Sequence, residues 1–148
     1  MRTKTRYSLR NHKSFAACMV FLAILVNSCE LTEDMINTDA GKLEGTWQCD
    51  EQSELYKSTA EIYTAYISLD ADADNRIIID NFYQLGDVGV RANIIGLAVY
   101  ISTQTLEGGF TVSGSGTISS GYSRIEWSYT VDDGSGVDDH VTAVYTKQ

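Results

Sequence analysis

The amino-acid sequence predicts an all-β fold, an eight-stranded antiparallel up-and-down barrel, in the part of the chain that follows residue 41. From Gly45 onward, apolar side chains recur every second residue, which is the period of a strand and not of a helix. Turn-forming residues interrupt this pattern at short intervals, as they do between antiparallel strands. The composition is rich in Tyr, Ile, Val, Thr, Ser and Gly, and the chain has no proline. Such a composition favours strands and turns.

Polar segments separate the first three predicted strands. The first strand covers residues 45–50, and residues 51–59 after it are ambiguous and fit a short helical turn. The second covers residues 60–69 and ends at Asp70-Ala-Asp-Ala-Asp-Asn75. We predict that this acidic run is a solvated hairpin turn, because Asp and Asn side chains cap turns by bonding to nearby backbone groups. The third strand covers residues 76–83.

Glycines mark the boundaries of the later strands. The fourth and fifth strands meet at Gly96, and the sixth follows Gly108-Gly109. A turn rich in Asp and Gly joins the last two strands. These five strands cover residues 89–95, 97–102, 110–119, 123–131 and 140–146.

The sixth and seventh predicted strands show the alternation most clearly. Apolar residues and glycines occupy one face of each strand, and polar residues occupy the other. Antiparallel strands with one wet face give this pattern. Gly114 and Gly116 fall on the apolar face, where they let the sheet coil or leave room for a bulky neighbour such as Trp127. Room for a ligand is the alternative.

The strand count and the short connections favour a closed barrel. Closing a meander of eight strands removes its exposed edges. Side chains can just fill the interior of such a barrel, or the interior can hold one small ligand. A β-sandwich of the immunoglobulin type is the alternative, since its strand number is similar and only its Greek-key pairing differs.

Gly45-Thr46-Trp47, near the start of the first strand, resembles the Gly-x-Trp signature of lipocalins and the wider calycin group. In that family the tryptophan closes the floor of the barrel and a basic residue packs over it, for which Arg124 and Lys147 are the candidates here. The resemblance covers about residues 42–148, which we assign to a lipocalin-like β-barrel domain.

This resemblance implies that the barrel binds a small hydrophobic or amphipathic molecule. Tyrosines on the inward face combine an apolar body with a hydroxyl group and suit such a site, although they also suit a filled core. The candidate lining or floor residues are Trp47, Tyr63, Ile67, Phe110, Val112, Trp127 and Tyr129. The alternative function is a non-enzymatic structural or interaction module with a filled core, such as a surface-complex subunit, an inhibitor or an adhesin.

The N-terminal segment has the organisation of a secretory signal. Five basic residues and no acidic residue occur in residues 1–28, and the run from Ser14 to Val26 contains no charge. This run is shorter than the roughly 20 residues that a membrane-spanning helix needs. An uncleaved anchor and an ordinary cleaved signal are the alternatives.

Leu25-Val26-Asn27-Ser28-Cys29 resembles the lipobox of bacterial lipoproteins. The resemblance implies that residues 1–28 are a lipoprotein signal peptide and that a diacylglyceryl group is attached to Cys29. Residues 29–41 would then be the acylated N-terminus and tether, with two or three acyl chains providing a stable membrane anchor. We therefore expect a lipoprotein in the outer membrane of a Gram-negative bacterium, periplasmic or surface-exposed.

The charge distribution bears on possible partners. Residues 29–148 contain six Lys and Arg against all 20 Asp and Glu of the chain, a formal charge of −14. Because such a chain repels phosphate backbones, we expect no nucleic-acid partner. The acidity is typical of a soluble surface, with a cationic ligand or partner as the alternative. The identity of any protein partner is open.

Signatures of catalysis are absent from the sequence after residue 28, so we predict no enzymatic activity, no cofactor and no metal. His140 is the one histidine in that region, which excludes a zinc site of several histidines, and we predict that it lies at the surface. The run from Asp70 to Asn75 resembles the opening of a calcium loop, but it lacks the Gly and Glu of such loops. Cys49 would be the one free thiol, because Cys18 leaves with the signal, and we predict that it is a buried apolar side chain.

Overall fold

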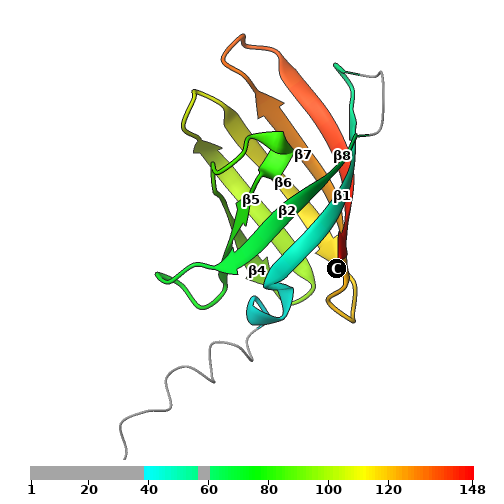
Figure 1. The fold of residues 1–148 in the computed structure, drawn as a ribbon. Helices are drawn as coiled ribbons and strands as arrows, with labels where there is room; N and C mark the ends of the chain where they lie inside the picture. Colours follow the sequence, from blue (N-terminus) through cyan, green and yellow to red (C-terminus); the bar gives the residue numbers. More distant parts are fainter. Residues whose placement is uncertain (1–38, 57–60) are drawn as a thin grey trace, which may run out of the picture. The chain divides into compact units, whose positions relative to one another are not determined.

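The computed structural model describes residues 39–56 and 61–148, which form eight β-strands and two short 3₁₀ helices (Figure 1). The helices are η1 (Gly41–Leu43) and η2 (Phe82–Gln84). The strands are β1 (Gly45–Ser53), β2 (Glu61–Leu69), β3 (Arg76–Asp80), β4 (Val90–Ile95), β5 (Ala98–Thr105), β6 (Thr111–Ile118), β7 (Arg124–Asp132) and β8 (Asp138–Lys147). Within these residues, no helix has the length and apolar character that a membrane crossing requires.

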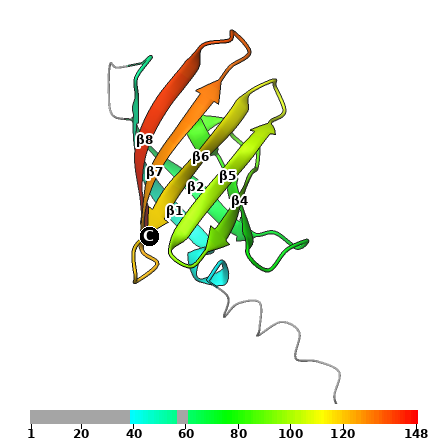
Figure 2. The same cartoon turned by 180° about the vertical axis from the view of Figure 1, so that it is seen from behind.

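The strands form a closed antiparallel barrel in which sequence neighbours are also hydrogen-bonded neighbours (Figures 1 and 2). Pairing of β8 with β1 closes the sheet, with Cys49 opposite Tyr145. The predicted all-β class, strand number and up-and-down order are therefore confirmed, and the alternative of a Greek-key sandwich is excluded.

The observed strand boundaries differ from the predicted ones by two or more residues in four strands, of which β5 continues to Thr105 instead of residue 102. β1 continues to Ser53 because residues 51–53 pair with β8, and β8 begins already at Asp138 because its first residues pair with the end of β7. β3 ends at Asp80 instead of residue 83. Asn81 and Tyr83 have left-handed backbone conformations, with φ of 59° and 52°, and these turn the chain into η2.

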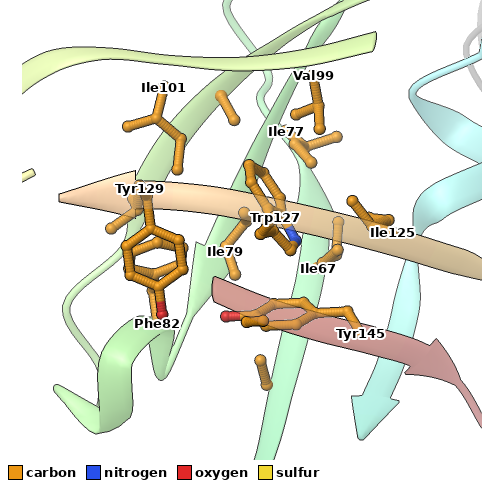
Figure 3. Packing of buried hydrophobic residues seen from close by; sticks show 14 of the residues in the cluster. Ile67, Ile77, Ile79, Phe82, Val99, Ile101, Ile125, Trp127, Tyr129 and Tyr145 are labelled. Atoms are coloured by element: carbon orange, nitrogen blue, oxygen red, sulfur yellow. The ribbon is translucent and has the colours of Figure 1, made fainter. Parts of the chain in front are cut away.

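The barrel interior is filled mainly by apolar side chains from every strand. Figure 3 shows the ring of Trp127 on β7 among isoleucines of β2 and β3. Phe82 from η2 packs against Tyr129, with ring centroids 4.5 Å apart, and meets Trp127 edge-on at 6.2 Å. The indole N–H of Trp127 is buried without a hydrogen-bond partner in the described part of the chain. Trp127 therefore contributes to the core by packing.

Gly114 and Gly116 on β6 make room for the large side chains of β7. Gly114 lies opposite Tyr129 and Gly116 lies opposite Trp127. A Cβ atom added at Gly116 would lie 3.0 Å from Cδ2 of Trp127 and 2.9 Å from Cγ1 of Val99. The prediction that these glycines accommodate bulky neighbours is confirmed.

The base of the barrel, which we define as the end beside η1, is closed by Trp47. Its side chain is fully buried, and its Nε1 donates a hydrogen bond of 2.8 Å to the carbonyl of Leu43. The ammonium of Lys147 lies 5.9 Å from the centroid of the Trp47 ring and donates to the carbonyl of Lys42 at 2.6 Å. Of the two candidates for the basic residue over the tryptophan, the structure selects Lys147, whereas Arg124 pairs with Glu126 on the same strand.

The acidic turn between β2 and β3 is held by Asp70. As predicted, its side chain caps the turn, since Oδ1 accepts a hydrogen bond of 3.0 Å from the amide of Asp72. Its Oδ2 also lies 2.7 Å from Nε of Arg76 and 3.2 Å from Nε of Arg91. The Asp70 side chain is only 4% exposed, so the turn is less solvated at this residue than we predicted. The hydrogen bond from Arg76 and that from the Asp72 amide lower the pKa of Asp70 to about 2.

We expect the ion pair of Asp70 to make the barrel lose stability in acid. The pKa of an unfolded aspartate is about 3.9. Because the folded pKa is lower, the ionised side chain stabilises the fold above a pH of about 4, and this contribution is lost as the pH falls toward 2. In thermal unfolding between pH 6 and pH 2, Asp70→Asn should melt below the wild type at pH 6 and converge with it near pH 2. Asp74→Asn, in an exposed residue of the same turn, should keep the wild-type profile.

Candidate functional site

A cavity of about 540 Å³ lies at the end of the barrel opposite η1, where β1 ends and β8 begins. Small-molecule sites usually have volumes of about 300–1,000 Å³, so the cavity is large enough for a ligand. Three kinds of segment line it: the ends of β1, β7 and β8, the η2 region, and the loops that precede β6 and β8. The residues that matter most below are Glu51, Ser53, Tyr83, Phe110, Val131 and Asp139.

Glu51 reaches the cavity from the inward face of β1. The alternation that buries Trp47 and Cys49 also turns Glu51 inward, where the residue is only 6% exposed. Its Oε2 accepts a hydrogen bond of 2.6 Å from the hydroxyl of Tyr63 and another from the hydroxyl of Tyr129. Donors on β2 and β7 thus hold a carboxylate between the filled core and the cavity.

The tyrosines around Glu51 keep their hydroxyl protons and can therefore donate hydrogen bonds. Burial, followed by the nearby Glu51 charge, raises the pKa of Tyr63. Burial is also the main cause that raises the pKa of Tyr129 and of Tyr145. The hydroxyl of Tyr145 lies 3.1 Å from that of Tyr63, which extends the network into the core.

Asp139 is the second buried carboxylate at the cavity and is only 2% exposed. Its Oδ2 accepts hydrogen bonds from the hydroxyls of Ser53 and Tyr83, at 2.6 and 2.7 Å. Its Oδ1 accepts from the amides of Glu54 and Leu55, both at 3.1 Å. Burial raises the pKa of Asp139, but these hydrogen bonds outweigh it and leave the pKa below its usual value. The side chain is therefore ionised at neutral pH.

The exposed mouth of the cavity has three apolar side chains, Leu55, Tyr56 and Val137, beside the polar residues Asp133 and Ser135. The three apolar side chains are 50%, 64% and 54% accessible to solvent. Deeper in, Phe110 and Val131 continue the apolar lining toward the two carboxylates. The site thus combines apolar side chains at its mouth and walls with buried charged groups, which suits a molecule that has both an apolar and a polar part.

The seven candidate lining residues are divided between the cavity and the core. Phe110 lines the cavity. Tyr63 and Tyr129 do not line it, but both donate hydrogen bonds to Glu51, which forms part of its polar inner wall. The other four, Trp47, Ile67, Val112 and Trp127, are buried in the apolar core. Contact of these seven residues with a ligand remains a prediction, and Cys29 lies outside the described residues.

Sequence reasoning missed the two buried carboxylates, although both carry a signal. Glu51 follows Trp47 and Cys49 at the spacing of two that marks the inward face of β1. Asp139 precedes Val141, Ala143 and Tyr145 at the same spacing on β8. A charged residue at an inward position of a barrel strand indicates a polar site inside the barrel.

Neither of the other two side chains considered for chemistry, His140 and Cys49, lines the cavity. His140 is exposed on the outer face of β8, as predicted. No three His, Cys, Asp or Glu side chains are arranged to hold a metal ion within residues 39–56 and 61–148. Cys49 is fully buried, as predicted, and burial raises the pKa of its thiol to about 12.

We expect Cys49 to be unreactive in the folded protein. Since alkylating reagents attack the thiolate, a pKa of about 12 should slow alkylation at pH 8 by on the order of a thousandfold relative to a free thiol, before any effect of steric burial. Peptide mapping after iodoacetamide treatment of the full chain should find Cys49 unmodified. The same treatment in denaturant should modify it fully. Modification of the folded protein at the rate of a free thiol would contradict the buried position.

The fold and the cavity define the class of protein as an eight-stranded antiparallel β-barrel with an acidic, amphipathic cavity at one end. The chain matches no model of a known protein family, and it has no significant match among curated proteins. The interpretation of the site therefore rests on its geometry.

Proposed function

We propose that this protein is a lipocalin-like lipoprotein, anchored to the membrane through Cys29, whose barrel binds a small amphipathic molecule. The observation that carries the binding proposal is the cavity of about 540 Å³, which combines apolar side chains at its mouth with carboxylates at its inner end. An apolar part of the ligand would lie against Phe110 and Val131. A polar part would lie toward Glu51 and Asp139.

Binding of a neutral amphipathic probe tests the cavity. We expect N-phenyl-1-naphthylamine to bind the full chain saturably, with one probe per chain and an increase in fluorescence. Leu55→Asp should weaken binding by at least about tenfold, because Leu55 provides apolar surface at the mouth. Ile95→Asp is the matched control, since Ile95 is also apolar and exposed but lies outside the cavity lining.

The outcome also separates the two candidate functions. Equal effects of both variants would place the probe on the surface and not in the cavity. No saturable binding by the wild type would contradict ligand binding. That result would favour the non-enzymatic interaction module with a filled core.

The membrane anchor is tested independently of the ligand. In a Gram-negative host supplied with labelled palmitate, the wild type should incorporate label and sediment with the membrane fraction. Cys29→Ser should incorporate none, because the acylated thiol is gone, whereas Cys49→Ser should incorporate label normally. An unlabelled wild type would contradict the lipoprotein assignment and leave the ligand proposal unaffected.

A further inference from the structure

We propose that the ligand of this cavity is an amphipathic organic cation, a molecule with an ammonium group joined to an apolar body. This inference rests on the proposed function and adds the charge of the ligand. Three features carry it: the sign of the charges in the lining, the aromatic rings beside them, and the lack of a convergent metal site.

The charged lining residues are all acidic. Glu51, Asp133 and Asp139 line the cavity, and no Lys, Arg or His occurs among the lining residues that the structure describes. The four hydrogen bonds to Asp139 come from two hydroxyls and two amides, which are neutral donors and leave its negative charge in place. A concave site lined by charges of one sign concentrates their field and attracts ions of the opposite sign. The same field opposes a fatty acid or another anionic amphiphile.

Aromatic rings provide a second interaction that only a cation uses. Tyr56, Tyr83 and Phe110 all line the cavity. The face of an aromatic ring attracts an ammonium group, by about 0.5–1 kcal/mol at exposed sites and more where water is excluded. Rings next to carboxylates are therefore a suitable environment for an ammonium group, and the apolar side chains of the mouth accommodate the rest of the molecule.

A metal ion is a poorer explanation for the acidic groups. A divalent cation needs several oxygen ligands that converge at short distance. The described residues contain no such convergent group of His, Cys, Asp or Glu side chains. An organic cation has no such requirement, because its charge interacts with the field of the whole cavity.

Three unbranched ligands with the same number of carbon atoms test the charge preference on the wild-type full chain. Decylamine is a cation at pH 7, decanol is neutral and decanoate is an anion. The affinity of each ligand is measured by its displacement of N-phenyl-1-naphthylamine, and we expect it to fall in the order decylamine, decanol, decanoate. The cation should bind at least about tenfold more tightly than the anion at low ionic strength. Raising the salt concentration to 0.5 M should reduce this ratio.

Charge-removing variants locate the preference in the cavity. Asp139→Asn and Asp133→Asn should each lower the ratio of decylamine to decanoate affinity. Asp138→Asn is the matched control, because the neighbouring Asp138 faces outward and does not line the cavity. Since Asp133 is exposed, its variant remains informative if Asp139→Asn does not fold.

Each outcome has a definite meaning. Equal or tighter binding of decanoate, or an effect of Asp138→Asn as large as that of the cavity variants, would overturn the cationic ligand and leave the proposed function intact. If the naphthylamine probe binds but none of the three ligands displaces it, the cationic amphiphile is also wrong. If the probe itself does not bind, the proposed function fails and this inference fails with it.

Discussion

Gly114→Ala is expected to destabilise the barrel by about 3 kcal/mol, at the upper end of what overpacking usually costs. A Cβ atom at this position would lie 2.4 Å from Cβ of Tyr129 and 2.6 Å from both Cα of Tyr129 and the backbone oxygen of Ser128. These are atoms at or near the backbone of β7, so no change of side-chain rotamer relieves the overlap. Strands β6 and β7 would have to separate where they are paired.

Two further glycines make this prediction a graded test. At Gly116 the added atom would meet Val99, Glu126 and Trp127 at 2.9–3.0 Å, so a smaller loss of stability is expected. At Gly121 the nearest atom is Oγ of Ser123 at 3.8 Å, and substitution by alanine should change the stability little. Denaturant unfolding of the three alanine variants measures the loss of stability for each and so tests the expected order. A loss for Gly121→Ala as large as that for Gly114→Ala would show that the close packing of β6 on β7 is not the cause.

The strands and their order were predictable because they depend on local pattern. A barrel strand has one face toward the core and one toward water, and this alternation is written along β6 and β7 with few exceptions. Turn residues mark the strand ends. The up-and-down order then follows from the short connections, because a short connection places consecutive strands next to each other, where they pair.

The end of β3 and the conformation of η2 were not predictable from the same pattern. Residues 76–83 read as one strand, yet the chain turns at Asn81. The buried side chain after this turn is Phe82, which is out of phase with Ile77 and Ile79. Its position depends on contact with Tyr129, a residue distant in the sequence.

The candidate site depends even more on long-range contacts. Phe110, one of the seven predicted lining residues, lies beside the cavity, and its contact with a ligand stays a prediction. Glu51 is held by Tyr63 and Tyr129 from two other strands, and Asp139 is held by residues 53–55 and Tyr83. Alternation shows that these carboxylates point inward. Only the packed structure shows which inward aromatic side chains fill the core and which line the cavity.

Asp139→Ala is expected to lower the free energy of unfolding by about 3 kcal/mol. Hydrogen bonds to a charged group contribute about 1.5–3 kcal/mol each, and solvent in the cavity replaces part of what is lost when the acceptor is removed. The truncation removes an acceptor from two hydroxyls and two amides at once, and of these four donors the amide of Glu54 keeps a second acceptor, the carbonyl of His140 at 3.0 Å. These donors join the end of β1 to η2 and β8, so hydrogen exchange should increase first at the amide of Leu55, for which Asp139 is the acceptor.

The conservative variant shows whether the hydrogen bonds or the charge account for this loss. Asn in place of Asp139 keeps one oxygen that can accept from the amides of Glu54 and Leu55, and its NH₂ can donate to the hydroxyls of Ser53 and Tyr83, which also accept. We therefore expect Asp139→Asn to retain most of the stability and to show a weaker preference for cationic ligands. Denaturant unfolding and decylamine binding, measured on both variants, separate the two roles. If Asp139→Asn were as unstable as Asp139→Ala, the negative charge itself would hold the mouth of the cavity together, and the role we assign to hydrogen bonding would be wrong.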